Sequence, residues 1–498
     1  MDIDFSNKRN DSPILSVFIF IALLVGSPIS LYVLFTRWAE SPQRLAVAVL
    51  GILTITAFLC VRKKYEVLIA ALLFFSQFKM SLHSIALDAP VNLQFLFIDI
   101  IFALFLVGGV ERRERLRPDG VGWLFILLIS WQLIISFLHS AHVQRSLLFV
   151  LWQLKYLVVY LFVRNLELTD SFARQIKRIA FLVLLIQGAL AIVQQISGAT
   201  LGLSVLGEQD ASRLFFVEGG LRVSGTLGAT NALAGYLAML LVLCLPFLLR
   251  KQGNLIYYGA YGAGCAGLLF ALSRAGWLAF MVGTGAVLFC MLRTGMIRPS
   301  RVMVFGLLGL MAVSTAVMVY RDRIESRFEN KEAVASALGR FHQLNEAWPI
   351  IERYPLLGIG PGVTEFYGAW NENEKFVRKR LPLVRLSNQP HSSQLQYWIE
   401  SGTPGFCLFM LVLLMVAITV LEISRNFKEA SEPSMLRIGA SAAALAAMTH
   451  ASFGTEINNP QIVMTFWILF ALARNRSVAV PADQRVHAIR MRSEAYKQ

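Results

Sequence analysis

Apolar residues fill most of this 498-residue chain in long runs that short polar connections separate. A helix that crosses a bilayer needs about 20 predominantly apolar residues, so a window of about 19 residues finds candidate spans. The scan predicts fourteen, near residues 14–35, 45–60, 66–80, 93–110, 121–138, 146–163, 178–196, 228–249, 254–272, 275–292, 302–320, 400–422, 437–454 and 460–473. The second, third and last are short. The pattern therefore predicts an all-α, polytopic integral membrane protein with about 12–14 transmembrane helices.

One long segment, residues 321–405, is rich in charge and carries turn chemistry. From Val334 to Ile351 its apolar residues recur at spacings of three and four, which predicts an amphipathic helix. Pro349 should kink or end that helix. Residues 354–362 then hold three glycines and two prolines, a composition that favours a tight turn and equally a backbone cradle for an anion. We interpret the segment as a polar working surface on a membrane scaffold.

Composition agrees with a membrane protein, since 56% of the residues are hydrophobic, 15% are charged and the mean hydropathy is +0.59. The net charge of +15, from 46 Lys and Arg against 31 Asp and Glu, would indicate a nucleic-acid partner in a soluble protein. Here the basic residues cluster between apolar runs, as the positive-inside rule requires, and no nucleic-acid module is recognisable. We expect inner-membrane lipids as partners and no nucleic acid.

The basic connections also give the orientation. If the N-terminus is cytoplasmic, the even-numbered connections lie inside, and these are the ones rich in Lys and Arg. The long polar segment then falls on the outer side. We predict four regions, namely residues 1–320 with transmembrane helices 1–11 and short loops, 321–392 as one long periplasmic loop, 393–473 with helices 12–14, and 474–498 as a cytoplasmic tail.

Other polar or small residues inside the apolar runs carry weaker signals. The five cysteines stand at no metal-ligand spacing, so the sequence predicts neither a metal site nor a disulfide framework. Asp99 and Lys155 are functional candidates because ionisable groups are costly in hydrocarbon, although each could instead pair or reach polar surroundings near a helix end. Small residues between Gly259 and Gly285 predict that the ninth and tenth helices approach other helices closely.

Three residues that suit phosphate and proton-transfer chemistry fall on the predicted outer side. Arg222 stands at the mouth of the eighth helix, Arg274 at the tight junction of the ninth and tenth, and His391 where the long loop meets the twelfth. Arginine suits a diphosphate because its planar fork stays charged and donates two parallel hydrogen bonds. The alternative is that each arginine snorkels to the interface and that His391 caps a loop.

The order of these motifs resembles a known family. The motifs are Arg222 with Gly225 and Asn231, the Ser273-Arg274-x-Gly276 junction, the turn over residues 354–362, and His391 followed by Glu400, Gly402 and Gly405. Together they resemble the O-antigen ligase and Wzy-type O-antigen polymerase superfamily of bacterial membrane glycan ligases and polymerases. The resemblance covers residues 222–405, whereas the first seven helices resemble the family only in being apolar.

The resemblance implies a metal-independent glycosyltransferase of GT-C-like fold in the bacterial inner membrane, with its active site on the periplasmic face and no cofactor. Its donor would be an undecaprenyl-diphosphate-linked glycan, and its acceptor a glycan or a lipid A-core. Polysaccharide export or chain-length proteins would be partners in lipopolysaccharide or exopolysaccharide biosynthesis. The resemblance also implies that His391 is catalytic and that Arg222 and Arg274 bind the diphosphate. Arg340, Gly360, Gln394 and Glu400 are possible supporting residues.

Two features of the sequence narrow the alternatives. No Asp-x-Asp stands on the outer side, which disfavours a metal-dependent nucleotide-sugar transferase, and Glu400 is half a helical turn out of phase with His391, so the two should not form a dyad. A transporter or flippase of lipid-linked oligosaccharide stays open as an alternative, but it should place its polar residues at mid-bilayer. Sequence does not separate polymerase from ligase.

Overall fold

The computed structural model describes most of the chain from Lys64 onward. The described residues are 64–79, 81–86, 92–96, 102, 117–140, 142–209, 216–217, 220–250, 254–301, 303, 306, 331–364, 390–426, 431–454 and 459–475. Three predicted spans (14–35, 45–60 and nearly all of 302–320), Asp99 and almost the whole predicted tail lie outside them. For residues 331–341, which include Arg340, only the backbone is described.

Helices make up nearly all of the described structure. They are α3 (Lys64–Phe75), α5 (Gly120–Leu138), α6 (Val143–Asn165), α7 (Asp170–Ser197), α8 (Thr230–Leu249), α9 (Leu255–Phe270), α10 (Arg274–Arg293), α13 (Lys331–Arg353), α15 (Ser393–Asn426), α16 (Glu432–Ala451) and α17 (Pro460–Ala473). Among the described residues, six helices are long and apolar enough to cross a membrane, namely α5, α6, α7, α8, α10 and α15. The predicted helical, polytopic membrane fold is confirmed.

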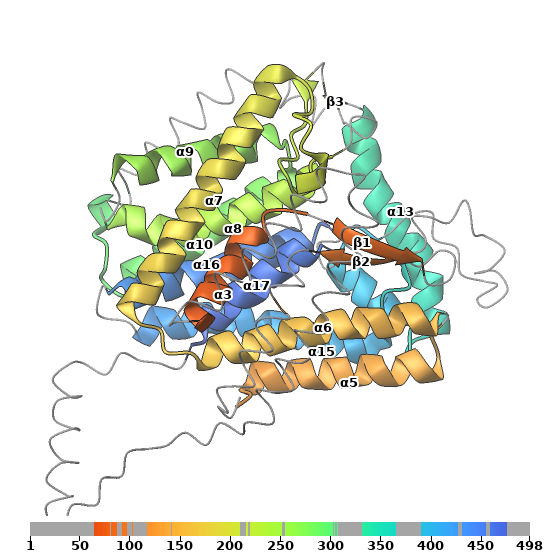
Figure 1. Ribbon diagram of the computed structural model, residues 1–498. Helices are drawn as coiled ribbons and strands as arrows, with labels where there is room; N and C mark the ends of the chain where they lie inside the picture. Colours follow the sequence, from red (N-terminus) through yellow and green to blue (C-terminus); the bar gives the residue numbers. More distant parts are fainter. Residues whose placement is uncertain are drawn as a thin grey trace, which may run out of the picture. The chain divides into compact units, whose positions relative to one another are not determined.

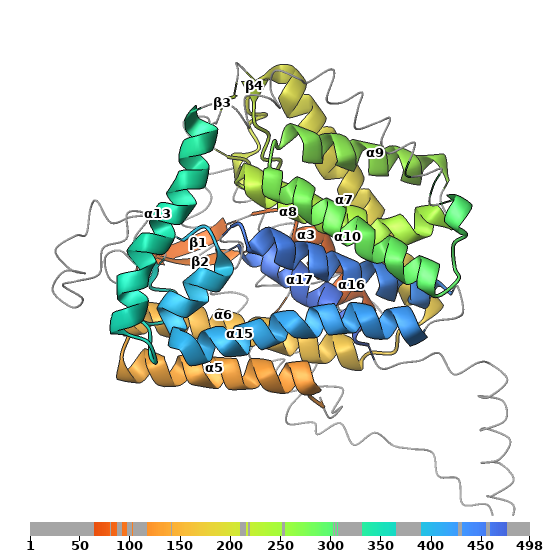
Figure 2. The same cartoon turned by 180° about the vertical axis from the view of Figure 1, so that it is seen from behind.

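The helices pack around a central pair, α16 and α17. Helix α16 contacts α8, α10, α15 and α17, and α17 also contacts α6. Both ribbon views show α7 to α10 on one side of this pair and α5, α6 and α15 on the other (Figures 1 and 2). Helix α8 is almost wholly buried by protein, so it is a membrane-type helix that meets little lipid.

Small residues allow this close packing. A Cβ on Gly439 of α16 would collide with the Leu243 carbonyl of α8, and Gly283 of α10 lies against Val242 and Ala446. The prediction that α9 and α10 approach other helices closely is confirmed at Gly264, Gly267, Gly276 and Gly283 but not at Gly259, Gly262 and Gly285, where nothing lies within 4 Å. The glycines therefore split into those that face a helix and those that do not.

Three local features differ from the sequence prediction. Strands β1 (Ser81–Ala86) and β2 (Asn92–Leu96) form an antiparallel hairpin, so the span predicted from residue 93 begins in a strand. A second, shorter hairpin joins β3 (Phe216–Val217) and β4 (Gly220–Leu221). Helix α13 passes through Pro349 and ends at Arg353, so Pro349 does not end it.

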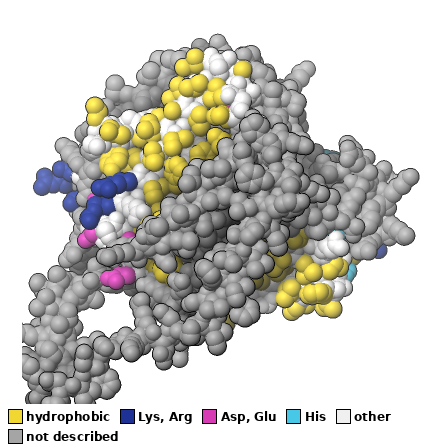
Figure 3. All heavy atoms as spheres, in the orientation of Figure 1, with side chains coloured by type: hydrophobic (Ala, Val, Ile, Leu, Met, Phe, Trp, Pro, Cys, Tyr) yellow, Lys and Arg dark blue, Asp and Glu magenta, His cyan; other side chains and the backbone are white. Residues whose placement is uncertain are grey.

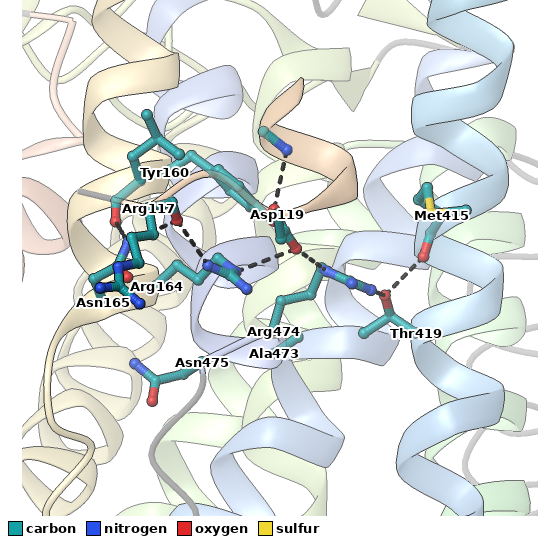
Figure 4. Close-up of polar contacts among 12 residues, drawn as sticks. Arg117, Asp119, Tyr160, Arg164, Asn165, Met415, Thr419, Ala473, Arg474 and Asn475 are labelled. Carbon is teal, nitrogen blue, oxygen red and sulfur yellow. Dashed lines mark hydrogen bonds and ion pairs between the residues drawn. The ribbon is translucent and has the colours of Figure 1, made fainter. Parts of the chain in front are cut away.

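A cluster of charges ties several helices together at one end (Figure 4). Asp119 caps α5 by accepting from the Gly122 N–H at 3.0 Å. Its carboxylate also pairs with Arg164 at 3.1 Å and with Arg474 at 2.8 Å, and Arg474 donates to Thr419 of α15. These contacts join the start of α5 to the ends of α6, α15 and α17, and we call this end of the molecule the Asp119 end.

The partners of Asp119 determine its protonation. Burial alone would raise the pKa of its carboxyl, but the Gly122 N–H and the guanidinium groups of Arg474 and Arg164 outweigh burial and lower the pKa below its ordinary value of 3.8.

Lys177 and Glu432 form a further ion pair of 2.7 Å where α7 and α16 begin. Figure 3 shows Lys and Arg side chains gathered at the left edge of one face, while hydrophobic side chains cover much of its described surface.

Candidate functional site

The opposite end of the bundle collects the residues that the sequence singled out. Gly276 of α10 packs on Ala234 of α8, and Gly235 of α8 packs on His450 near the end of α16. Just beyond α16, the Gly454 carbonyl accepts from the Ser393 hydroxyl of α15 at 3.0 Å. These contacts bring the starts of α8, α10 and α15 to one end, which we call the His391 end.

Arg222 is half-buried and holds the junction between α9 and α10. Its Nε and Nη2 donate to the Ala271 carbonyl at 3.2 and 3.1 Å, and Nη2 also lies 3.4 Å from the Leu272 carbonyl. Nη2 further donates to Asn231 Oδ1 of α8 at 3.3 Å. The last carbonyls of a helix have no partner within the helix, so Arg222 supplies donors to the end of α9.

Arg274 is the first residue of α10 and is half-buried. The Ser273 hydroxyl caps the helix by accepting from the Gly276 N–H at 3.3 Å. Directly before it, Leu272 has a φ of 48°, a left-handed conformation that side chains other than glycine rarely adopt. The chain thus makes a sharp, constrained turn immediately before it presents Arg274.

His391 is exposed and stands two residues before α15. Its backbone N–H donates to Oε1 of Gln343, a buried side chain of α13, at 3.0 Å. Gln394, one turn further on, donates to Ser452 at 2.7 Å. The N-terminal part of α15 is therefore fixed from two sides, by α13 and by the segment that follows α16.

Helix α15 is broken ten residues into its length, and the turn over residues 354–362 fills the break. Gly402 has φ 64° and ψ −176°, and a Cβ there would collide with the Leu356 carbonyl. The Ile399 and Glu400 carbonyls, released from the helix, accept from the N–H groups of Ile359 and Gly360, each at 3.0 Å. Turn and helix form one unit.

Glu400 is buried and closes this unit. Its carboxylate accepts from the N–H groups of Gly362 at 2.8 Å and Thr364 at 3.0 Å, from the Thr364 hydroxyl, and from Gln396 at 3.1 Å. The sequence left two interpretations of residues 354–362 open, a tight turn and a backbone cradle for an anion. The segment is a turn, and its end does bind an anion, which is the carboxylate of Glu400.

Arg145 is a buried cation in this region that sequence reasoning missed. Its Nε donates to the Gly362 carbonyl at 3.3 Å and its guanidinium lies 5.3 Å from the centre of the Trp152 ring. Nearby, Ser146 donates to the Pro361 carbonyl at 2.8 Å. The available signal was its position in the short polar connection between two predicted spans, which gave no motif.

Lys79 is a second residue that the sequence did not single out. Its N–H donates to the Thr226 carbonyl at 3.2 Å, and its Nζ would lie 3.7 Å from a Cβ on Gly228. Below it, Gln187 of α7 donates to the Thr226 hydroxyl at 2.6 Å and to Gln77 at 3.1 Å. The loop that follows Arg222 is thus held by a buried polar network.

The remaining predicted site residues have smaller parts. His342 of α13 is an exposed surface residue that pairs with Glu346 at 3.1 Å. Lys155 is buried in α6, with its Nζ 5.2 Å from the centre of the Tyr156 ring. No three His, Cys, Asp or Glu side chains of the described residues come together in a way that could hold a metal ion.

An apolar cavity of about 70 Å³ lies among α5, α6, α15, α16 and α17, and it reaches Ser393 at the start of α15. Most of its lining is hydrophobic, including Phe125, Phe409 and Trp467, and its few polar residues include Gln153 and Tyr397. Gln153 donates to the Tyr397 hydroxyl at 3.1 Å. The cavity therefore suits hydrocarbon better than a polar ligand.

The fold and this end of the bundle define a multi-pass membrane protein with arginine and histidine side chains at the starts of its helices. The family model for O-antigen ligase matches residues 259–410, which include Arg274, the 354–362 turn and His391 but not Arg222. Over these residues the predicted resemblance to the O-antigen ligase and Wzy superfamily is confirmed. No curated protein matches the chain.

Proposed function

We propose that this protein transfers a glycan from an undecaprenyl-diphosphate-linked donor to a sugar hydroxyl, as an O-antigen ligase or as a polymerase of surface polysaccharide. The observation that carries the proposal is the convergence of Arg222, Arg274 and His391 at one end of the bundle, within or next to the O-antigen ligase match. At family level the match supports glycan ligation or polymerisation.

The donor's diphosphate binds where α8 and α10 begin. Arg274 and Arg222 bring positive charge to this place, and the starts of the two helices add the positive ends of their dipoles. As the anomeric C–O bond breaks, the lipid diphosphate gains negative charge that these fixed cations stabilise. The apolar cavity beside Ser393 supports a donor with a hydrocarbon chain.

His391 acts on the acceptor. The acceptor hydroxyl oxygen forms the new bond to the anomeric carbon, the bond from that carbon to the diphosphate oxygen breaks, and the hydroxyl proton passes to the imidazole. A histidine suits this step because its unperturbed pKa lies near working pH. Exposure of His391 beside the fixed start of α15 supports the assignment. Gln394 and Glu400 act as supports, Glu400 through the turn that contains Gly360.

The reaction takes place on the periplasmic face of the inner membrane. In the described residues the Asp119 end holds most of the Lys and Arg that terminate helices, including Arg164, Arg293 and Arg474. By the positive-inside rule that end is cytoplasmic, which leaves the His391 end outside. The same polarity disfavours the transporter alternative, because the candidate residues gather at one end and not at mid-bilayer.

A reconstituted transfer assay tests the function. Purified protein receives undecaprenyl-diphosphate-linked glycan and either a lipid A-core or a second lipid-linked glycan as acceptor. We expect product with one acceptor only, which separates ligase from polymerase, and no product from His391→Ala, although that variant still binds the donor. His342→Ala, on the neighbouring helix, is the matched control and should remain active. Wild-type turnover by His391→Ala would refute the role of His391.

A further inference from the structure

The contacts of Arg222 raise the question of how it serves the donor site. An arginine binds phosphate best with two parallel N–H groups, either Nε with Nη2 or Nη1 with Nη2. Both forks need Nη2, and in this structure Nη2 donates toward the Ala271 and Leu272 carbonyls and Asn231. Neither fork of Arg222 can therefore engage a diphosphate without giving up contacts to the protein.

The carbonyls that Arg222 holds belong to the turn that positions Arg274. Ala271 and Leu272 precede the capping residue Ser273 and the first helical residue Arg274. Val223, next to Arg222, extends the same attachment by donating its N–H to the Phe270 carbonyl at 3.5 Å. The chain around Arg222 is thus fastened to every residue from Phe270 to Leu272.

The turn needs hydrogen bonds from outside it because Leu272 has an unfavourable backbone conformation. Among the described residues, Leu272 is the one non-glycine residue with a positive φ. The left-handed conformation is unfavourable for a residue with a Cβ, so the turn would relax toward ordinary backbone angles if its carbonyls were released. Relaxation would move Ser273 and Arg274, because they follow Leu272 directly.

We infer that Arg222 is a positioning residue, which fixes the left-handed turn at Leu272 so that Arg274 points its guanidinium at the diphosphate. This inference rests on the proposed donor site and divides its two arginines by role. Arg274 contacts the donor, whereas Arg222 acts through the backbone of residues 271 and 272. The Ala271, Leu272 and Asn231 oxygens that accept from Arg222 orient its guanidinium.

A set of double variants tests this division. Arg222→Ala is combined with Leu272→Gly and, separately, with Leu272→Ala. Both changes remove the buried atoms of Leu272 beyond Cβ, but only glycine adopts a positive φ without cost. If Arg222 holds the turn, Arg222→Ala/Leu272→Gly should be about tenfold more active than Arg222→Ala/Leu272→Ala. The two Leu272 variants should differ little when Arg222 is present, and not at all in an Arg274→Ala background.

Binding of undecaprenyl diphosphate without a glycan gives a second readout. Its dissociation constant should rise in Arg222→Ala, recover with Leu272→Gly and stay high with Leu272→Ala, while thermal unfolding shows that each variant is folded. Equal activity and binding in the two double variants would overturn the inference, because Arg222 would then contact the donor itself. Normal binding by Arg274→Ala would instead refute the proposed donor site, whatever Arg222 does.

Discussion

The two ends of the helix bundle use arginine in different ways. At the Asp119 end, Arg164 and Arg474 share the Asp119 carboxylate, and Arg474 also pairs with Glu422 at 3.4 Å, so two acids oppose the two guanidinium charges. At the His391 end, Nε and Nη2 of Arg222 bond to neutral carbonyl and amide oxygens, and the buried acid Glu400 accepts hydrogen bonds from backbone and side-chain donors. The arginines at the Asp119 end therefore stabilise the fold through an acid, whereas Arg222 is bonded to the turn that precedes Arg274, the arginine proposed to contact the ligand.

The comparison predicts its largest effect on stability at Asp119. Asp119→Asn keeps an N-cap side chain, since Asn caps helices about as well as Asp, but it removes the charge between the buried Arg164 and the half-buried Arg474 guanidinium groups. Breaking a buried pair in this way costs about 3–5 kcal/mol. Thermal unfolding in detergent should show this loss, whereas Asp170→Asn, an exposed first-turn residue of α7, should change stability by less than about 0.5 kcal/mol.

The same cluster predicts how stability depends on pH. The pKa of Asp119 lies below 3.8 in the folded protein, so its contribution to stability is fully present above about pH 4 and is lost as pH falls through the folded-state value. Acid unfolding of the wild type should therefore be steeper than that of Asp119→Asn in this range. Parallel acid profiles would show that Asp119 does not contribute in this way.

At the other end, Arg274→Ala should affect activity and leave the fold intact. Loss of a charge-assisted hydrogen bond to the leaving diphosphate costs about 1.5–3 kcal/mol, which is a tenfold to hundredfold lower rate of transfer. Arg274→Lys should recover little, because a point ammonium does not reproduce the fork. Initial rates with a lipid-linked donor measure this effect, and full activity of both variants would make Arg274 an interfacial anchor.

A smaller effect is expected at Glu400, which is buried like Asp119 but bonded mainly to neutral donors. Glu400→Gln sets an amide N–H₂ against backbone N–H groups and should cost about 1–3 kcal/mol through one unsatisfied buried donor. Hydrogen exchange should become faster at Gly362 and Thr364 and stay unchanged in α8. Glu352→Gln, on the exposed face of α13, is the control, and unchanged exchange in Glu400→Gln would show that the cradle does not depend on the carboxylate.

The smallest effect is expected at His342. Its pair with Glu346 is exposed, with 68% of the His342 side chain accessible, and surface pairs of this kind contribute about 0–1 kcal/mol. His342→Ala should therefore match the wild type in both unfolding temperature and transfer rate. A large loss of transfer would mean that the acceptor binds along α13.

Sequence predicted the helical fold well because apolar runs and basic connections are local signals. It also predicted that Arg222, Arg274 and His391 lie on the same side of the membrane, since successive connections of a polytopic chain alternate between the two sides. It did not predict Arg145 beneath Gly362, or Glu400 inside the 354–364 turn, because these contacts join residues that are 217 and 38 positions apart. The break at Gly402 was also unpredicted, since it depends on the turn that fills it.

The proposed reaction requires that the His391 end faces away from the cytoplasm. Single cysteines at Ala229, exposed beside α8, and at Arg117, exposed next to Asp119, would report the two ends in a background without the native cysteines. A membrane-impermeant maleimide applied to cells with a permeabilised outer membrane should label Ala229→Cys at once, and Arg117→Cys only after the inner membrane is opened. Labelling of Arg117→Cys first would place Arg222, Arg274 and His391 in the cytoplasm and contradict the proposed reaction.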